Sequence, residues 1–135
     1  MQEALWCWQE ARRADQVGSA LLRIRDNIGL DFYEATTALL REVESSSRLL
    51  RDLYDLFPIY RPQVPTVSQH LAVILPSFQK ILKDMIIYLD HENLPALDKW
   101  NTMNERLGGQ DGMNLTQCFV LYIEYLVQNI RLLSR

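Results

Sequence analysis

The strongest constraint in this sequence is a spacing: apolar residues recur at every third or fourth position through five segments of the chain. This period matches the roughly 3.6 residues of one α-helical turn, so it places the apolar side chains of each segment on one helix face. The alternating pattern of a β-strand competes with it nowhere. The sequence therefore predicts an all-α fold, a bundle of four to five helices.

Residues that favour helix ends bound these segments. A capping box, in which a polar residue and the Glu or Gln three positions later cap the first turn, is predicted at Asp31, Thr66 and Asn114. Gly29 fits the left-handed position just after a helix, where it would end the first one. The expected helices are 4–28, 31–57, 66–89, 95–107 and 114–135.

Prolines shape the middle of the chain. Residues 58–65 hold three prolines, which predict an extended, stiff linker between the second and third helices. Pro76 falls inside the third helix, where it removes one backbone hydrogen bond and clashes with the preceding turn. We therefore expect a kink at this position, or a break near Leu75 with Pro76 opening a new helix.

Length and charge bound the class of protein. A chain of 135 residues is one domain, here spanning 1–135, and its 48% apolar content suffices for a core. Because the helical pattern continues to Arg135, the sequence leaves open whether the domain is cut from a longer protein. The 14 basic and 17 acidic residues give a net charge of −3 and form no basic face, so no nucleic-acid partner is expected.

The expected location is intracellular, in the cytoplasm. Residues 1–4 do not begin a signal peptide, and no apolar run reaches the roughly 18 residues that would span a membrane. The two cysteines, Cys7 and Cys118, form no framework of the secreted type, which favours buried thiols in a reducing compartment. A bridge between them would require the first and last helices to be neighbours.

Reactive side chains form no recognisable catalytic, metal or cofactor motif. His70 and His91 stand outside any metal-ligand spacing, and the serine run 45–47 lacks a nucleophile elbow. The acidic and basic residues of 41–55 have the spacing of ion pairs along one helix. The sequence thus predicts a protein that is not an enzyme and that needs no cofactor or metal.

The hypothesis about function rests on four aromatic residues. Trp6 and Trp8 flank Cys7, and Tyr122 and Tyr125 lie beside the main apolar face of the last helix. Trp and Tyr are enriched at the energetic centres of protein interfaces. We therefore expect a helical protein-interaction or oligomerisation module with these four as contact residues. The alternative is a bundle that binds an apolar small molecule or lipid in its core, beside Pro76.

The second half of the chain also resembles a helical domain found in predicted proteins of filamentous fungi. The matching stretches are Leu49–Leu53, Leu71–Phe78, Ile81–Met85, Trp100 and Leu121–Leu133, within residues 46–133. The Leu-Pro-Ser step at 75–77, inside an apolar helix, is the most particular of them. The resemblance implies an intracellular fungal protein, and it assigns no activity and no site residues.

Overall fold

Five α-helices make up most of the computed structural model, which describes residues 2–91, 93–108 and 113–135. In chain order they are α1 (Gln2–Arg25), α2 (Leu30–Leu56), α3 (Val64–Leu89), α4 (Ala96–Leu107) and α5 (Leu115–Leu133), with a short 3-10 helix, η1 (Arg61–Gln63), before α3. The described residues contain no β-strand. The predicted all-α fold is confirmed.

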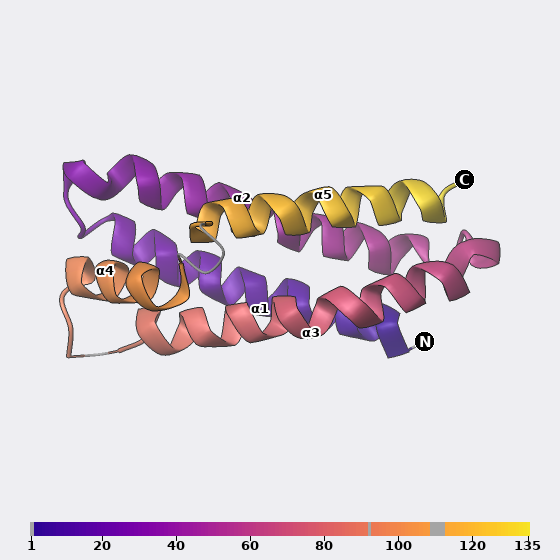
Figure 1. Ribbon diagram of the computed structural model, residues 1–135, viewed down its shortest axis with the longest axis horizontal. Coiled ribbons are helices and arrows are strands. Elements are labelled where there is room, and N and C mark those ends of the chain that lie inside the picture. Colours follow the sequence, from indigo (N-terminus) through magenta and orange to yellow (C-terminus); the bar gives the residue numbers. More distant parts are fainter. Residues whose placement is uncertain (1, 92, 109–112) are drawn as a thin grey trace.

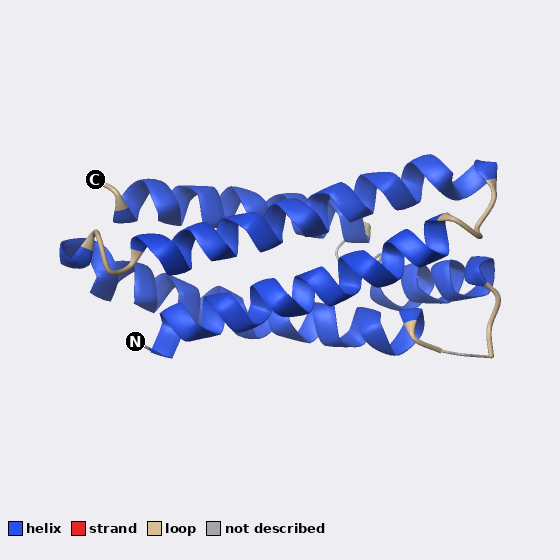
Figure 2. Cartoon of the chain, turned by 180° about the vertical axis from the view of Figure 1, so that it is seen from behind, coloured by secondary structure: helices blue, strands red, loops and turns tan. Residues whose placement is uncertain are grey.

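The four long helices lie side by side, and α4 packs mainly against α3 at one end (Figure 1). Packing is most extensive between α1 and α2, and the ring of neighbours continues from α2 to α5, from α5 to α3, and from α3 back to α1. Contact between α3 and α5 is the sparsest of the four. The face formed by α1 and α2, turned towards the viewer in Figure 2, therefore lies opposite the face formed by α3 and α5.

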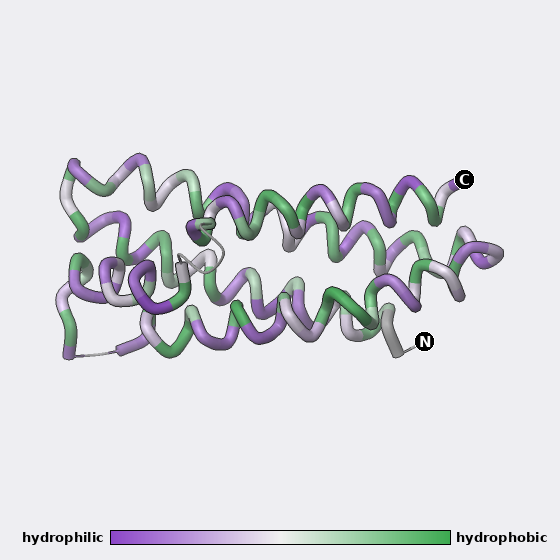
Figure 3. The backbone as a smooth tube through the Cα atoms, viewed as in Figure 1, coloured by the Kyte–Doolittle hydropathy of each residue, from purple (hydrophilic) through white to green (hydrophobic). Residues whose placement is uncertain are grey.

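The core follows the predicted spacing. Figure 3 shows apolar and polar stretches alternating along each helix, and the apolar ones meet in one cluster of buried side chains. The rings of Phe78 and Phe119 meet edge to face with centroids 5.8 Å apart, and Tyr122 packs against them at 5.2 and 6.0 Å. Within the described part of the chain, no helix combines the length and the apolar composition needed to cross a membrane.

Small side chains bring α1 and α2 close together. Ala11, Ala14 and Gly18 are buried on the face of α1 that meets α2. The hydroxyl of Ser47, on α2, lies 3.2 Å from the carbonyl oxygen of Ala11 and 2.6 Å from Oδ1 of Asp15. Each small residue buries little area, but together they allow the helices to approach until polar groups bond across the interface.

Of the three predicted capping boxes, only the one at Asn114 is present. The Asn114 side chain accepts a hydrogen bond from the backbone N–H of Gln117, whose side chain accepts one from the N–H of Asn114, both at 2.9 Å. The predictions at Asp31 and Thr66 are wrong, because α2 begins at Leu30 and α3 at Val64, and neither start has a side-chain cap. Both helices begin earlier than the capping residues, which leaves those residues inside the first turn.

The turn before α2 explains one of these early starts. Gly29 does adopt a positive φ, +91°, as expected of it, but it stands just before α2 rather than directly after α1, which ends at Arg25. Its extended ψ of 165° turns the chain so that Leu30 can already be helical. A side chain other than hydrogen at this φ would be strained.

The linker before the third helix differs from the prediction. Residues 58–65 do not form an extended linker, because η1 occupies 61–63 and Pro65 lies in the first turn of α3, a position that suits proline. Pro76 does not break the third helix, since α3 runs through it from Val64 to Leu89. Pro76 is exposed, whereas Leu75 and Phe78 on either side of it are buried, so core packing holds the two halves of α3 together.

The two cysteines lie on helices that are not neighbours in the ring. Cys7 is buried on α1 and Cys118 is partly buried on α5, and the structure places no disulfide bond between them. A bridge would require the first and last helices to be neighbours, and in this bundle they are not.

Two glycines should respond to alanine with opposite signs. Gly29→Ala forces a Cβ onto a positive φ and should lower the free energy of unfolding by about 1–3 kcal/mol. Gly18→Ala, within α1, places a Cβ in ordinary contact, 3.7 Å from Leu40 Cδ1, and should raise it by about 0.5–1 kcal/mol. Urea denaturation of both variants measures this, and an equal sign for the two would contradict the backbone described here.

Candidate functional site

The four aromatic residues predicted at an interaction surface do not share one surface. Trp6 is partly buried against the core and donates its indole N–H to Glu10 Oε2 at 3.0 Å. Tyr125, also partly buried, donates its hydroxyl to the carbonyl oxygen of His70 at 3.1 Å. Trp8 lines a groove between α1 and α2, and Tyr122 lines a cavity on the opposite side of the bundle.

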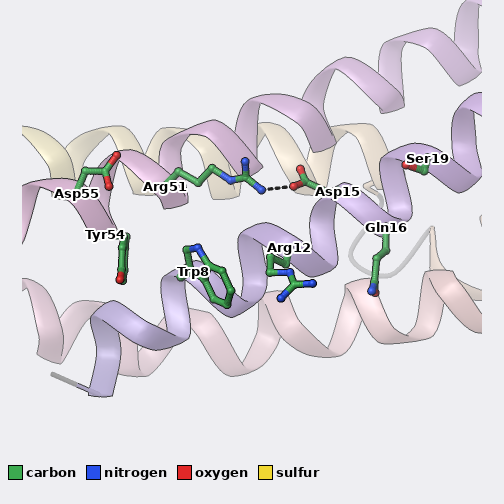
Figure 4. A pocket seen from close by; sticks show the side chains of 8 residues that line it. All are labelled: Trp8, Arg12, Asp15, Gln16, Ser19, Arg51, Tyr54 and Asp55. Atoms are coloured by element: carbon green, nitrogen blue, oxygen red, sulfur yellow. Dashed lines mark hydrogen bonds and ion pairs between the residues drawn. The ribbon is translucent and has the colours of Figure 1, made fainter.

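The groove between α1 and α2 is built around two aromatic rings. Trp8 and Tyr54 are 38% and 40% exposed, and Figure 4 shows their rings projecting from the two helices into the space between them. The cavity here has a volume of about 510 Å³. Its other lining residues are polar or charged: Arg12, Asp15, Gln16 and Ser19 from α1, and Arg51 and Asp55 from α2.

Charged groups line this groove, and one ion pair joins its two walls. The guanidinium of Arg12 lies over the Trp8 ring, 5.0 Å from its centroid, in a cation–π contact. Arg51 donates to Asp15 Oδ2 across the groove, the pair marked by the dashed line in Figure 4. The sequence placed the ion pairs of this region along α2 alone, and for Arg51 that is wrong. Helix spacing predicts partners within one helix, whereas this pairing depends on how α1 and α2 pack.

The groove continues along both helices. A second cavity of about 420 Å³ shares Asp15 and Ser19 with the first and extends to Leu22 on α1 and Leu40 on α2. From Trp8 to Leu22 the helical rise of about 1.5 Å per residue gives a length of about 21 Å. Ala14 and Gly18 line this part. The groove therefore has two aromatic rings at one end and the exposed Leu22 at the other, and the small side chains between them are already buried in the α1–α2 interface.

A buried carboxylate, which the sequence analysis missed, joins α1 to α3. The side chain of Glu10 is fully buried and accepts four hydrogen bonds. Two come from Arg13 Nη1, at 2.6 and 2.7 Å, and the others come from Trp6 Nε1 and from Gln79 Nε2 on α3, both at 3.0 Å. The sequence does contain an indication of this burial. Glu10 follows Cys7 by three residues, a spacing that puts this acidic residue on the apolar face of α1.

A second polar contact joins α3 to α5. The side-chain amide of Asn129, buried on α5, donates to the carbonyl oxygen of Tyr125 at 2.9 Å, so its Oδ1 is left to face His70 Nδ1 at 3.1 Å. Because an amide oxygen can only accept, the donor in this hydrogen bond is the Nδ1–H of His70. Asn129 takes a place on the buried face of α5 that the sequence assigned to apolar residues.

Groups able to bind a metal or to attack a substrate are scattered over the described residues. No three His, Cys, Asp or Glu side chains in that part of the chain lie close enough together to hold a metal ion. Ser46 and Ser47, from the serine run, are buried and bonded to backbone carbonyls of Val43 and Ala11. The features that remain as candidates are the α1–α2 groove and the cavity beside Tyr122.

No family model matches the sequence, and the searches of curated proteins and of solved structures find no significant match.

Proposed function

We propose that this chain is a non-enzymatic helical domain that binds an amphipathic helix of a partner protein in the groove between α1 and α2. The observation that carries the proposal is the exposed aromatic pair, Trp8 and Tyr54, at one end of that groove. Half-exposed Trp and Tyr side chains lining a concave surface have the composition of an interface centre, where a few aromatic residues carry most of the binding energy.

The shape and lining of the groove favour a helix as the occupant. Its length of about 21 Å accommodates roughly four helical turns. Trp8 with Tyr54 at one end and Leu22, which is 42% exposed, at the other provide apolar contacts. Such a partner would insert apolar side chains at these ends, as helices in grooves commonly do.

Charges along the walls would set the orientation of that helix. Arg12 and Asp55 lie near the aromatic end, while Arg25 and Glu44 line the other part of the groove. A partner helix with charges opposite to these in one direction would meet like charges in the reverse direction, and complementarity of this kind selects register. We further propose an intracellular location, in line with the two cysteines and with the resemblance to a fungal helical domain.

The test compares a groove variant with a matched surface variant. Trp8→Ala combined with Tyr54→Ala removes the aromatic end, and Val73→Ala, at a 76% exposed position on α3, is the control. Proteins isolated on each form from extracts of the native cell are quantified. We expect a partner that wild type and the control retain and that the groove variant loses, with binding weaker by at least about 2 kcal/mol, or roughly 30-fold.

Two further measurements identify the occupant. A peptide from the partner should gain helical circular dichroism on binding, and amide exchange should slow in α1 and α2. Light scattering after gel filtration tests self-association, and a dimer that the groove variant dissociates would make the occupant a second copy of this chain. If the groove variant retains every partner, or if wild type has none, the proposal fails.

A further inference from the structure

Another cavity, on the opposite side of the bundle from the α1–α2 groove, lies between α3 and α5, the neighbouring long helices with the fewest contacts. It has a volume of about 330 Å³ and is bounded by α3, by the end of α4 and by the start of α5. This is at the lower end of the range in which proteins bind small molecules, about 300–1,000 Å³. Because the α3–α5 face lies opposite the α1–α2 face, this cavity is separate from the groove of the proposed function.

One side of the cavity is apolar. Ile81 from α3, Leu107 from α4 and Met113, just before α5, line it together with the ring of Tyr122. Ile81, Leu107 and Tyr122 are also packed against the bundle core. A methylene chain or an aromatic ring placed here would thus continue the apolar core towards the surface.

The polar side of the cavity holds two cations and one carboxylate among its described residues, namely Lys80, Arg106 and Asp84. Lys80 donates to Asp84 at 2.8 Å, and this hydrogen bond, with the attraction between the charges, raises the pKa of the Lys80 ammonium above its ordinary value. These two charges offset each other. Arg106 also lines the cavity, and no hydrogen bond or ion pair joins its side chain to another of the described residues. Among the described lining residues, its guanidinium is therefore the one charge that no opposite charge offsets.

Hydroxyl groups add hydrogen-bond donors beside these cations. Ser77 Oγ accepts a hydrogen bond from the hydroxyl of Tyr122 at 3.3 Å, which places two hydroxyl groups side by side in the cavity lining. Lys80 has three donors and uses one on Asp84. A guanidinium, an ammonium and a hydroxyl beside an apolar wall are the groups that recognise an anionic head with an apolar body.

We propose that this cavity binds an amphiphilic carboxylate, with its carboxylate on Arg106 and its apolar body against Ile81, Leu107 and Met113. A carboxylate suits the planar guanidinium, which can donate two parallel hydrogen bonds to it. The apolar wall requires more than a small ion, and the cation requires more than a neutral chain. Both parts of the ligand are therefore needed for binding.

Isothermal titration with three probes separates these requirements. Octanoate has both parts, octan-1-ol lacks the charge, and acetate lacks the chain. We expect one saturable octanoate site per chain, with octanol and acetate each at least about tenfold weaker. Arg106→Gln should weaken octanoate binding about tenfold, since a neutral amide replaces a charge-assisted bond. Lys83→Gln, at an exposed position of α3 outside the cavity, should leave the affinity unchanged.

Each other result counts against the site. Equal affinity for octanol and octanoate would show that the charge plays no part, and equal loss in Arg106→Gln and Lys83→Gln would show general attraction to a positive surface. Absence of saturable octanoate binding would exclude the cavity as a site for this ligand class. Trp8→Ala with Tyr54→Ala should bind octanoate normally, so failure of either proposal can be told from failure of the other.

Discussion

Phe78→Ala is expected to lower the free energy of unfolding by about 3–5 kcal/mol, because it truncates a large side chain at the centre of the core. Phe78 is 2% exposed and meets Phe119 and Tyr122 edge to face, with centroids 5.8 and 5.2 Å away. These rings come from α3 and α5, the neighbouring pair with the sparsest contact. Loss of the Phe78 ring would leave a cavity there that few surrounding groups could fill.

Urea denaturation of wild type and variant measures this loss. Val73→Ala on the same helix is the control, since Val73 is 76% exposed and its truncation should change stability by no more than about 0.5 kcal/mol. A loss below about 1 kcal/mol for Phe78→Ala would place this side chain outside the core and contradict the packing of α3.

Arg13→Met should be the second most destabilising change, at about 3 kcal/mol, because it leaves the buried carboxylate of Glu10 without its cation. Arg13 donates twice to Glu10, at 2.6 and 2.7 Å, and the Glu10 side chain is fully buried, whereas that of Arg13 is 27% exposed. The donors that remain, Trp6 and Gln79, are neutral. Hydrogen bonds from neutral groups offset only part of the cost of a buried charge.

The neighbouring residue provides a matched control. Arg12 is exposed and rests on Trp8, so Arg12→Met should cost no more than about 1 kcal/mol. The double variant Glu10→Met with Arg13→Met removes both charges, and it should be more stable than Arg13→Met alone, because no unpaired charge remains. If the double variant is instead the less stable of the two, the loss comes from packing and not from the charge.

The two proposed sites arise because the two faces of the bundle are packed differently. On the α1–α2 face, small residues bring the helices together, and the larger side chains beside them become the walls of a long groove. On the α3–α5 face, sparse packing leaves a compact cavity that α4 helps to close. A helix fits the first shape and a small molecule fits the second.

Helix ends show how local signals compete. Asn114 caps α5 as predicted, because its side chain accepts a hydrogen bond from the backbone N–H of Gln117 and so satisfies one donor of the first turn. Asp31 and Thr66 have the same chemistry, but Gly29 and Pro65 allow helix to begin before them. A capping motif thus marks where a helix can begin, while the preceding turn decides whether it begins earlier.

The sequence by itself determined the fold class, the five helices and most of the buried face of each, because a helix of known period presents the same side chains to any partner. It did not determine which faces would meet. Three features join residues on different helices: the pairing of Arg51 with Asp15, the hydrogen bond from Gln79 to the buried Glu10, and the shared groove of Trp8 and Tyr54. Only the tertiary structure decided these, because contacts between helices depend on their order and rotation in the bundle, which the spacing within one helix does not contain.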